Sequence, residues 1–345
     1  MNRKRIFHIP IFVPHIGCPH DCVFCNQRKI TGQTESDDLP QIKRTVEAHL
    51  ESINSSVSRN NAYIEIAFFG GSFTAVELSR QTELMRLAHE YLASGMIDAV
   101  RCSTRPDCIN EENLAMLKSY GMSVIELGVQ STDDEVLRLS DRGHTYADVI
   151  KASNLIRSYD MKLGLQMMTG LPGDTPEKSV ATARDIISLN PDCVRIYPTL
   201  VVEGTRLNDM YNSGEYVPFS LEETVALCAR LVKMFEQNNI DIIRLGLQTT
   251  DNINENAVKG PYHAAIKELV TGRIMRECIE KHAKFPCDEL VLGVNPSNVS
   301  SLVGHKRANK EYFFEKYGAN FKIVQDESLD NTHLSIFGKT VDIYE

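Results

Sequence analysis

Short apolar runs typical of β-strands alternate with longer stretches that have the spacing of amphipathic helices over most of the chain. Such alternation indicates βα units, in which helices join parallel strands and cover the sheet. Six successive units exceed a single βαβ pair but fall short of the eight that close a TIM barrel. We therefore expect an α/β fold with a partial (βα)6 TIM-like barrel. The predicted strands are 6–14, 62–69, 98–103, 122–129, 162–168, 193–198 and 241–247, and the predicted helices are 40–56, 76–93, 111–120, 133–139, 146–159, 176–189 and 221–238.

The pattern changes after about residue 250. The segment Asp251–Gly260 is polar and ends in glycine, as a linker would. Further elements are expected at 262–281 (helix), 288–294 (strand), 307–317 (helix), 321–325 (strand) and 332–337 (strand). We expect two parts, the partial barrel in 1–250 and a small C-terminal α/β appendage in 251–345.

Composition and charge indicate the class of protein. Hydrophobic residues make up 42% of the 345 residues and charged residues 24%, which is ordinary for a globular protein with a substantial core. The 37 Lys and Arg are outnumbered by 46 Asp and Glu, so a uniformly basic nucleic-acid-binding surface is excluded, whereas a local basic patch is not. No window approaches the ~18 consecutive apolar residues of a membrane span, and no signal peptide precedes the first strand. We expect a cytoplasmic protein without a membrane partner.

Three of the nine cysteines are clustered on one short loop. The odd total indicates no disulfide framework, and the six scattered cysteines are typical of small buried side chains. Cys18, Cys22 and Cys25 have the spacing C-x3-C-x2-C and directly follow the first predicted strand. Three thiolates can hold three irons of a cubane cluster, which leaves the fourth iron open to another ligand. An open coordination position is typical of a catalytic metal site.

Two other interpretations of this loop remain open from the residues alone. The three cysteines with His15 or His20 form a possible zinc ligand set, which would make the chain a non-catalytic zinc-binding module. The Cys22–Cys25 spacing also occurs in thiol redox sites, although such a site leaves Cys18 unexplained.

The cysteine loop, with aromatic Phe24 before its third cysteine, resembles the cluster loop of the radical S-adenosylmethionine (radical SAM) superfamily. The resemblance implies two cofactors, a 4Fe-4S cluster held by these cysteines and SAM. It implies reductive cleavage of SAM to a 5′-deoxyadenosyl radical, which abstracts a hydrogen atom from the substrate. It also implies an electron donor such as flavodoxin or ferredoxin, while the protein itself binds and orients the reactants.

The same resemblance implies SAM contacts at the ends of the following strands. Gly70–Ser72 matches a motif that meets the SAM amino group, and Ser103 stands where the relatives carry Glu. Gln130 is expected at the ribose and Arg142 at the carboxylate, while Gln166 stands where relatives place His or Asp. The full expected set is Phe24, Gly70, Gly71, Ser72, Ser103, Gln130, Arg142 and Gln166. No catalytic side chain acting on the substrate is identified.

Two further segments, Gly128–Thr145 and Val194–Thr205, are similar to the radical SAM half of the Elongator complex catalytic subunit. That family modifies carbon 5 of the wobble uridine in tRNA, so the resemblance implies tRNA nucleoside modification and a tRNA partner. We expect no acetyltransferase domain after residue 250, and acetyl transfer is not carried over. The turn Gly170–Gly173 also resembles oxygen-independent coproporphyrinogen oxidase, so a small metabolite such as a tetrapyrrole is the alternative substrate.

The C-terminal part carries a group of cations near the predicted 307–317 helix. They are either an RNA contact or the solvated face of that helix. The group consists of Lys306, Arg307, Lys310, Lys316 and Lys322.

Overall fold

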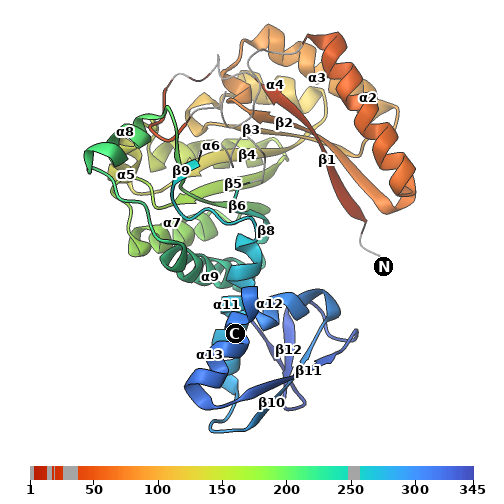
Figure 1. Ribbon diagram of the computed structural model, residues 1–345. Helices are drawn as coiled ribbons and strands as arrows, with labels where there is room; N and C mark the ends of the chain where they lie inside the picture. Colours follow the sequence, from red (N-terminus) through yellow and green to blue (C-terminus); the bar gives the residue numbers. More distant parts are fainter. Residues whose placement is uncertain (1–3, 14–17, 19, 26–37, 248–256) are drawn as a thin grey trace.

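Figure 1 shows the computed structural model of the chain, which describes residues 4–13, 18, 20–25, 38–247 and 257–345. Its main feature is a parallel sheet of seven strands in the order β1-β2-β3-β4-β5-β6-β8, curled into a half-barrel. The strands are β1 (Arg5–Val13), β2 (Ala62–Gly70), β3 (Ala99–Thr104), β4 (Met122–Gln130), β5 (Lys162–Thr169), β6 (Cys193–Pro198) and β8 (Asp241–Leu245). The expected partial barrel and the position of each of its strands are confirmed.

Helices connect consecutive strands and cover the outer face of the sheet (Figure 1). They are α2 (Leu39–Ser56), α3 (Leu78–Ala93), α4 (Glu111–Ser119), α5 (Asp134–Leu139), α6 (Tyr146–Ser158), α7 (Pro176–Ser188) and α9 (Leu221–Gln237). Side-chain caps define where several of them begin. The Thr175 hydroxyl accepts a hydrogen bond from the Lys178 amide, and Pro176 occupies the first helical position. At the start of α9, Ser220 and Glu223 form a reciprocal capping box.

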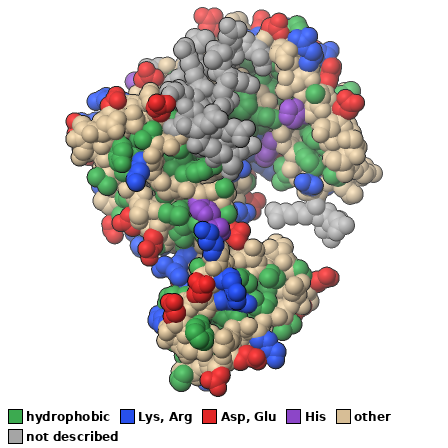
Figure 2. Space-filling model, viewed as in Figure 1, with side chains coloured by type: hydrophobic (Ala, Val, Ile, Leu, Met, Phe, Trp, Pro, Cys, Tyr) green, Lys and Arg blue, Asp and Glu red, His purple; other side chains and the backbone are tan. Residues whose placement is uncertain are grey.

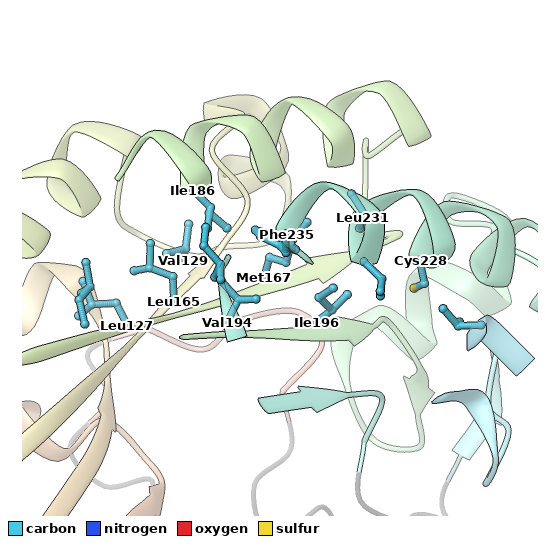
Figure 3. Packing of buried hydrophobic residues seen from close by; sticks show 14 of the residues in the cluster. Leu127, Val129, Leu165, Met167, Ile186, Val194, Ile196, Cys228, Leu231 and Phe235 are labelled. Atoms are coloured by element: carbon cyan, nitrogen blue, oxygen red, sulfur yellow. The ribbon is translucent and has the colours of Figure 1, made fainter. Parts of the chain in front are cut away.

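The outer face of the sheet is apolar because alternate residues of each strand point to it. Figure 3 shows Leu127, Leu165 and Val194 among the side chains packed between the strands and the helices α7 and α9. Met167 of β5 is also buried in this core, as methionine commonly is. The intervening residues face the inside of the half-barrel and are polar on several strands.

A second, four-stranded sheet with the order β11-β10-β12-β13 forms the C-terminal part. Its elements are α11 (Ile266–His282), β10 (Glu289–Val294), α12 (Val299–Val303), α13 (Ala308–Tyr317), β11 (Asn320–Gln325), β12 (His333–Ile336) and β13 (Lys339–Asp342). The predicted helices and strands are present, whereas α12 and β13 were not expected. Both are short, and short elements leave little periodic signal.

The described residues 199–247 and 257–260 also hold three short elements that the periodicity missed, namely β7 (Val201–Val202), α8 (Arg206–Ser213) and β9 (Ala257–Lys259). The predicted division at residue 250, with most of the linker Asp251–Gly260, lies outside the described residues and stays a prediction. Among the residues that the structure describes, no helix has the length and apolar character needed to cross a lipid bilayer.

Candidate active site

The cysteine loop follows β1 and is anchored at its middle by Val23. The Val23 amide donates a hydrogen bond to the Ser140 carbonyl at 3.1 Å, and the Leu207 amide of α8 donates to the Val23 carbonyl at 2.7 Å. The Val23 side chain is 1% exposed and lies in a small cluster separate from the main core. This cluster comprises Val23, Val201, Leu207 and Tyr216, with Phe24, Met210 and Tyr211 packed against it. The expected SAM contact Phe24 therefore packs toward α8.

Polar groups of three other segments surround two of the loop sulfurs. Arg142 Nη1 lies 3.3 Å and Arg105 Nη1 3.9 Å from Cys22 Sγ. Cys18 Sγ lies 3.5 Å from the hydroxyl of Ser72, at the end of β2. Two guanidinium groups beside one sulfur compensate the negative charge that a metal-bound thiolate carries. The surroundings therefore suit cysteines that act as metal ligands.

A zinc site at this loop would need a fourth ligand besides the three cysteines. In the described part of the chain, no three His, Cys, Asp or Glu side chains converge closely enough to hold one metal ion. A tetrahedral zinc site requires that convergence, whereas a cubane binds each cysteine through a different iron. His15 lies outside the described residues, and His20 Nε2 lies 4.0 Å from Asp107 Oδ2.

Arg142 and Arg105 are themselves held by neighbouring strand ends. Arg142 Nη2 donates to the Gly128 carbonyl at 2.7 Å, and a Cβ on Gly128 would lie 2.6 Å from that nitrogen. Glycine is thus required for the guanidinium to approach β4. Arg105 is 1% exposed, forms two hydrogen bonds with the Asp107 carboxylate at 2.9 and 3.0 Å, and donates to the Arg142 carbonyl. Both guanidinium groups are therefore fixed beside Cys22.

Gln130 ends β4 in a strained conformation close to Arg142. Its φ of 67° is in the left-handed region, where a non-glycine residue costs on the order of 1–3 kcal/mol. The buried Gln130 Oε1 and Arg142 Nε have no hydrogen-bond partner among the described residues. An unpaired buried donor and acceptor at one place fit a ligand that has a carboxylate and hydroxyl groups. SAM has both.

His144 follows Arg142 by two residues, and its side chain is neutral. It is buried, its Nε2 contacts the Val129 carbonyl at 3.2 Å, and its Nδ1 is unpartnered in the described structure. Burial, together with the charges of Arg142 and Arg105, lowers the pKa of His144 to about 3. It therefore adds no positive charge to the site near neutral pH.

The Gly70–Ser72 turn lies directly beside the end of β1. The Gly71 amide donates to the Val13 carbonyl at 2.9 Å. Gly70 has a φ of 98°, and a Cβ there would lie 2.9 Å from the same carbonyl oxygen. The two glycines thus bring the turn against the strand that precedes the cysteine loop. The structure brings this turn and Cys18 together.

Gln166 and Ser103 meet on the inner face of the half-barrel. Gln166 Nε2 donates to Ser103 Oγ at 3.1 Å and to Glu126 Oε2 at 3.0 Å. The two residues belong to β5 and β3, and Glu126 lies on β4 between them. They were expected near SAM because relatives place other polar residues at the same positions.

Sequence reasoning missed the buried charge network around Glu126, which is 1% exposed. Arg195 donates to its carboxylate at 2.5 and 3.0 Å, and Arg101 Nη1 at 2.8 Å. Burial raises the pKa of Glu126, but Arg195 and Arg101 outweigh it and hold that pKa below its ordinary value. Arg101 also contacts Glu65, whose carboxylate lies 2.8 Å from the His8 Nε2. The available signal was a charged residue flanked by apolar ones on each of β2, β3, β4 and β6.

Comparison with known proteins gives the family. Residues 12–186 match the Radical SAM superfamily model, and 191–276 match the Radical_SAM C-terminal domain model. A tRNA uridine(34) acetyltransferase of Dehalococcoides mccartyi is 27% identical over 61% of this chain and 52% of its own length. Human Elongator complex protein 3 is 28% identical over 57% of this chain and 39% of its own. The chain thus spans about half the length of the first of these relatives and less of the second.

The solved structure of archaeal Methanocaldococcus infernus Elp3 with an N-terminal deletion has a TM-score of 0.62 to this chain. It is 24% identical, and the match covers 81% of this chain and 63% of that one, which shows a shared fold. The expected resemblance to Elongator-type proteins is confirmed by these matches. Because a family model covers more than half of its residues, the chain belongs to the radical SAM superfamily.

Proposed function

We propose that this chain is an enzyme that holds a 4Fe-4S cluster through Cys18, Cys22 and Cys25 and binds SAM beside it. The observation that carries the proposal is the meeting of Cys22 Sγ with Arg142, next to the unpartnered Gln130 Oε1 and Arg142 Nε. When bound, the cluster and SAM together supply one-electron hydrogen-atom abstraction.

In this proposal the chain's own residues bind SAM and orient it. Arg142 pairs with the SAM carboxylate, because a fixed guanidinium suits carboxylate geometry. Gln130 accepts a hydrogen bond from a ribose hydroxyl through its unpartnered oxygen. The Gly70–Ser72 turn contacts the amino group, and Ser103 with Gln166 lines the inner face beyond it. Phe24 completes the loop by packing it against α8.

The proposed substrate is a nucleoside in tRNA. The support is the similarity to proteins named tRNA uridine(34) acetyltransferase and Elongator complex protein 3, which this chain matches over its half-barrel. Flavodoxin or ferredoxin is the proposed class of electron donor.

The cofactor proposal is tested by anaerobic reconstitution with iron and sulfide, followed by iron counting and a dithionite assay for 5′-deoxyadenosine. About four irons per chain and formation of 5′-deoxyadenosine are expected. Arg142→Ala should keep the iron but lose SAM binding, while Arg138→Ala, at an exposed ion pair with Glu135, should keep both. Zinc in place of iron, without SAM cleavage, would return the loop to the zinc-module interpretation.

The substrate proposal is tested separately by mass spectrometry of nucleosides from the tRNA of a deletion strain. A modified nucleoside should disappear and its precursor accumulate, and both should be reversed by the intact gene but not by the Cys22→Ala variant. A nucleoside profile identical to that of the parent strain would refute tRNA as the substrate without touching the cofactor proposal.

A further inference from the structure

The loop between α12 and α13 carries three consecutive basic or titratable residues, His305, Lys306 and Arg307. Lys306 and Arg307 are exposed, and neither forms an ion pair with any residue that the structure describes. Of the other cations predicted near this helix, Lys310 on α13 also forms no ion pair in the described structure, whereas the remaining two are paired. Lys316 pairs with Glu280 at 2.8 Å, and Lys322 pairs with Glu289 at 3.3 Å. The cations of this group without an ion pair are therefore Lys306 and Arg307 in the loop 305–307, here called the basic loop, and Lys310 in the helix that follows it.

The basic loop has a defined shape. Lys306 and Arg307 have φ values of 51° and 68°, so two successive non-glycine residues are left-handed. Asn309, which is 4% exposed, follows the loop and ties it to the neighbouring helices. Its Nδ2 donates to the Gly272 carbonyl of α11 at 2.9 Å and to the Leu302 carbonyl of α12 at 3.1 Å. The two cations are thus presented by a backbone that the neighbouring helices hold in place.

The basic loop lies at the edge of the half-barrel that holds the cysteine loop. The rings of His305 and His263 meet edge to face, with centroids 4.8 Å apart. His263 lines a narrow hollow with Pro198 and Gly246, which stand at the carboxyl ends of β6 and β8. Figure 2 shows His side chains beside Lys and Arg side chains where the half-barrel meets the C-terminal part. The cysteine loop follows the carboxyl end of β1, at the other end of the same sheet.

We propose that the basic loop binds backbone phosphates of the RNA whose nucleoside enters the half-barrel, an inference that rests on the proposed tRNA substrate. The basic loop adjoins β8 and the cysteine loop adjoins β1, so the sites stand at opposite ends of a seven-stranded sheet. With ~4.8 Å between neighbouring strands, the path along the curled sheet from one site to the other is roughly 25–30 Å, and the direct distance across the half-barrel is shorter. An RNA whose nucleoside enters the half-barrel has backbone phosphates that can reach the basic loop, whereas a small metabolite bound in the half-barrel gives that loop no role. Cations without carboxylate partners supply the sequence-independent part of RNA affinity.

The test is binding of bulk tRNA by the reconstituted chain at several salt concentrations, using Lys306→Asn with Arg307→Asn. Asparagine tolerates the left-handed conformation, so the variant removes charge while the backbone is kept. The matched control is Lys316→Gln with Lys322→Gln, which changes the net charge equally but removes cations that already have carboxylate partners. The loop variant should bind tRNA on the order of tenfold more weakly, with a salt dependence reduced by about 1–2 in the log–log slope. The control should bind like the parent chain.

Formation of 5′-deoxyadenosine without RNA should be unchanged in the loop variant. Unchanged tRNA affinity in this variant, or an equal loss in the control, would overturn the inference and leave the proposed function intact. Absence of tRNA binding by the parent chain would overturn the inference together with the tRNA substrate. Unchanged tRNA binding with slower flavodoxin-driven turnover would show that the loop serves an acidic protein partner instead.

Discussion

Replacing Glu126 by Gln is expected to destabilise the half-barrel strongly. The carboxylate is buried and bridges Arg101 and Arg195, and Arg195 has no second carboxylate partner among the described residues. The substitution keeps the volume but leaves the Arg195 guanidinium, whose side chain is 12% exposed, without its counter-charge. Breaking a buried pair from one side costs about 3–5 kcal/mol. For a chain of 345 residues, with an unfolding entropy of about 0.7 kcal/mol per K, this predicts a fall in Tm of about 4–7 °C.

Thermal unfolding of the apo chain, followed by circular dichroism, measures the effect. The control is Glu135→Gln, which removes a carboxylate that is 54% exposed and pairs with Arg138 on a helix surface, where little change is expected. Replacing Glu126 and Arg195 together by Leu should recover part of the loss, since apolar side chains need no counter-charge. A Tm for Glu126→Gln within about 1 °C of the parent chain would refute the reasoning.

The same network predicts a pH dependence. The pKa of Glu126 is lowered in the fold, because Arg195 and Arg101 outweigh the effect of burial. Its contribution is therefore complete above the ordinary pKa of 4.5 and is lost as the pH falls through the lowered value. The gap in stability between the parent chain and Glu126→Gln should close only in acid. A gap that narrows as the pH rises from 6 to 8 would contradict this assignment.

Three further outcomes are expected. Replacing any one of the three loop cysteines by Ala should abolish iron retention and SAM cleavage while the Tm of the apo chain stays the same. The control Cys287→Ala, at a half-buried position in the C-terminal part, should keep both the iron and SAM cleavage. Iron retained by a loop variant would argue against the ligand assignment. Arg142→Lys should weaken SAM binding about tenfold or more in equilibrium dialysis, because a lysine cannot reproduce the fixed guanidinium contacts; parental affinity would remove Arg142 from the site. Because the pKa of His144 is lowered to about 3, only the unfolded chain binds a proton at this residue between pH 6.5 and 4.5, and the unfolding free energy of the parent chain should fall there by up to about 1.4 kcal/mol per pH unit. His144→Gln should remove this part of the fall. Identical slopes for the two chains in urea titrations would show that His144 does not titrate as assigned.

Much of the fold was predictable because its signals are local. The apolar alternation in β4, with Leu127 and Val129 toward the helices, appears within one short segment. The Thr175 and Ser220 caps are likewise recognisable from a few neighbouring residues. The cysteine loop and the Gly70–Ser72 turn were found for the same reason, since each is contiguous.

The parts that escaped prediction depend on residues far apart in the chain. Glu126 and Arg195 are 69 residues apart, and only the pairing of β4 with β5 and β6 brings them together. The left-handed Gln130 lies at a register shift between β4 and β5, and such a shift arises from the pairing of two strands that are far apart in the chain. The basic loop was singled out by charge, but the ion pairs that neutralise Lys316 and Lys322 required the tertiary structure.

The docking of Val23 makes the cysteine loop a separate unit of stability. Its side chain belongs to a cluster of four buried residues that lies apart from the main core, and two backbone hydrogen bonds join Val23 to Ser140 and Leu207. Opening this attachment exposes far less apolar surface than unfolding the half-barrel, so it requires far less free energy. The loop can therefore be released while the sheet stays folded. Amide hydrogens at Val23 and Leu207 should accordingly exchange with solvent long before those of β4.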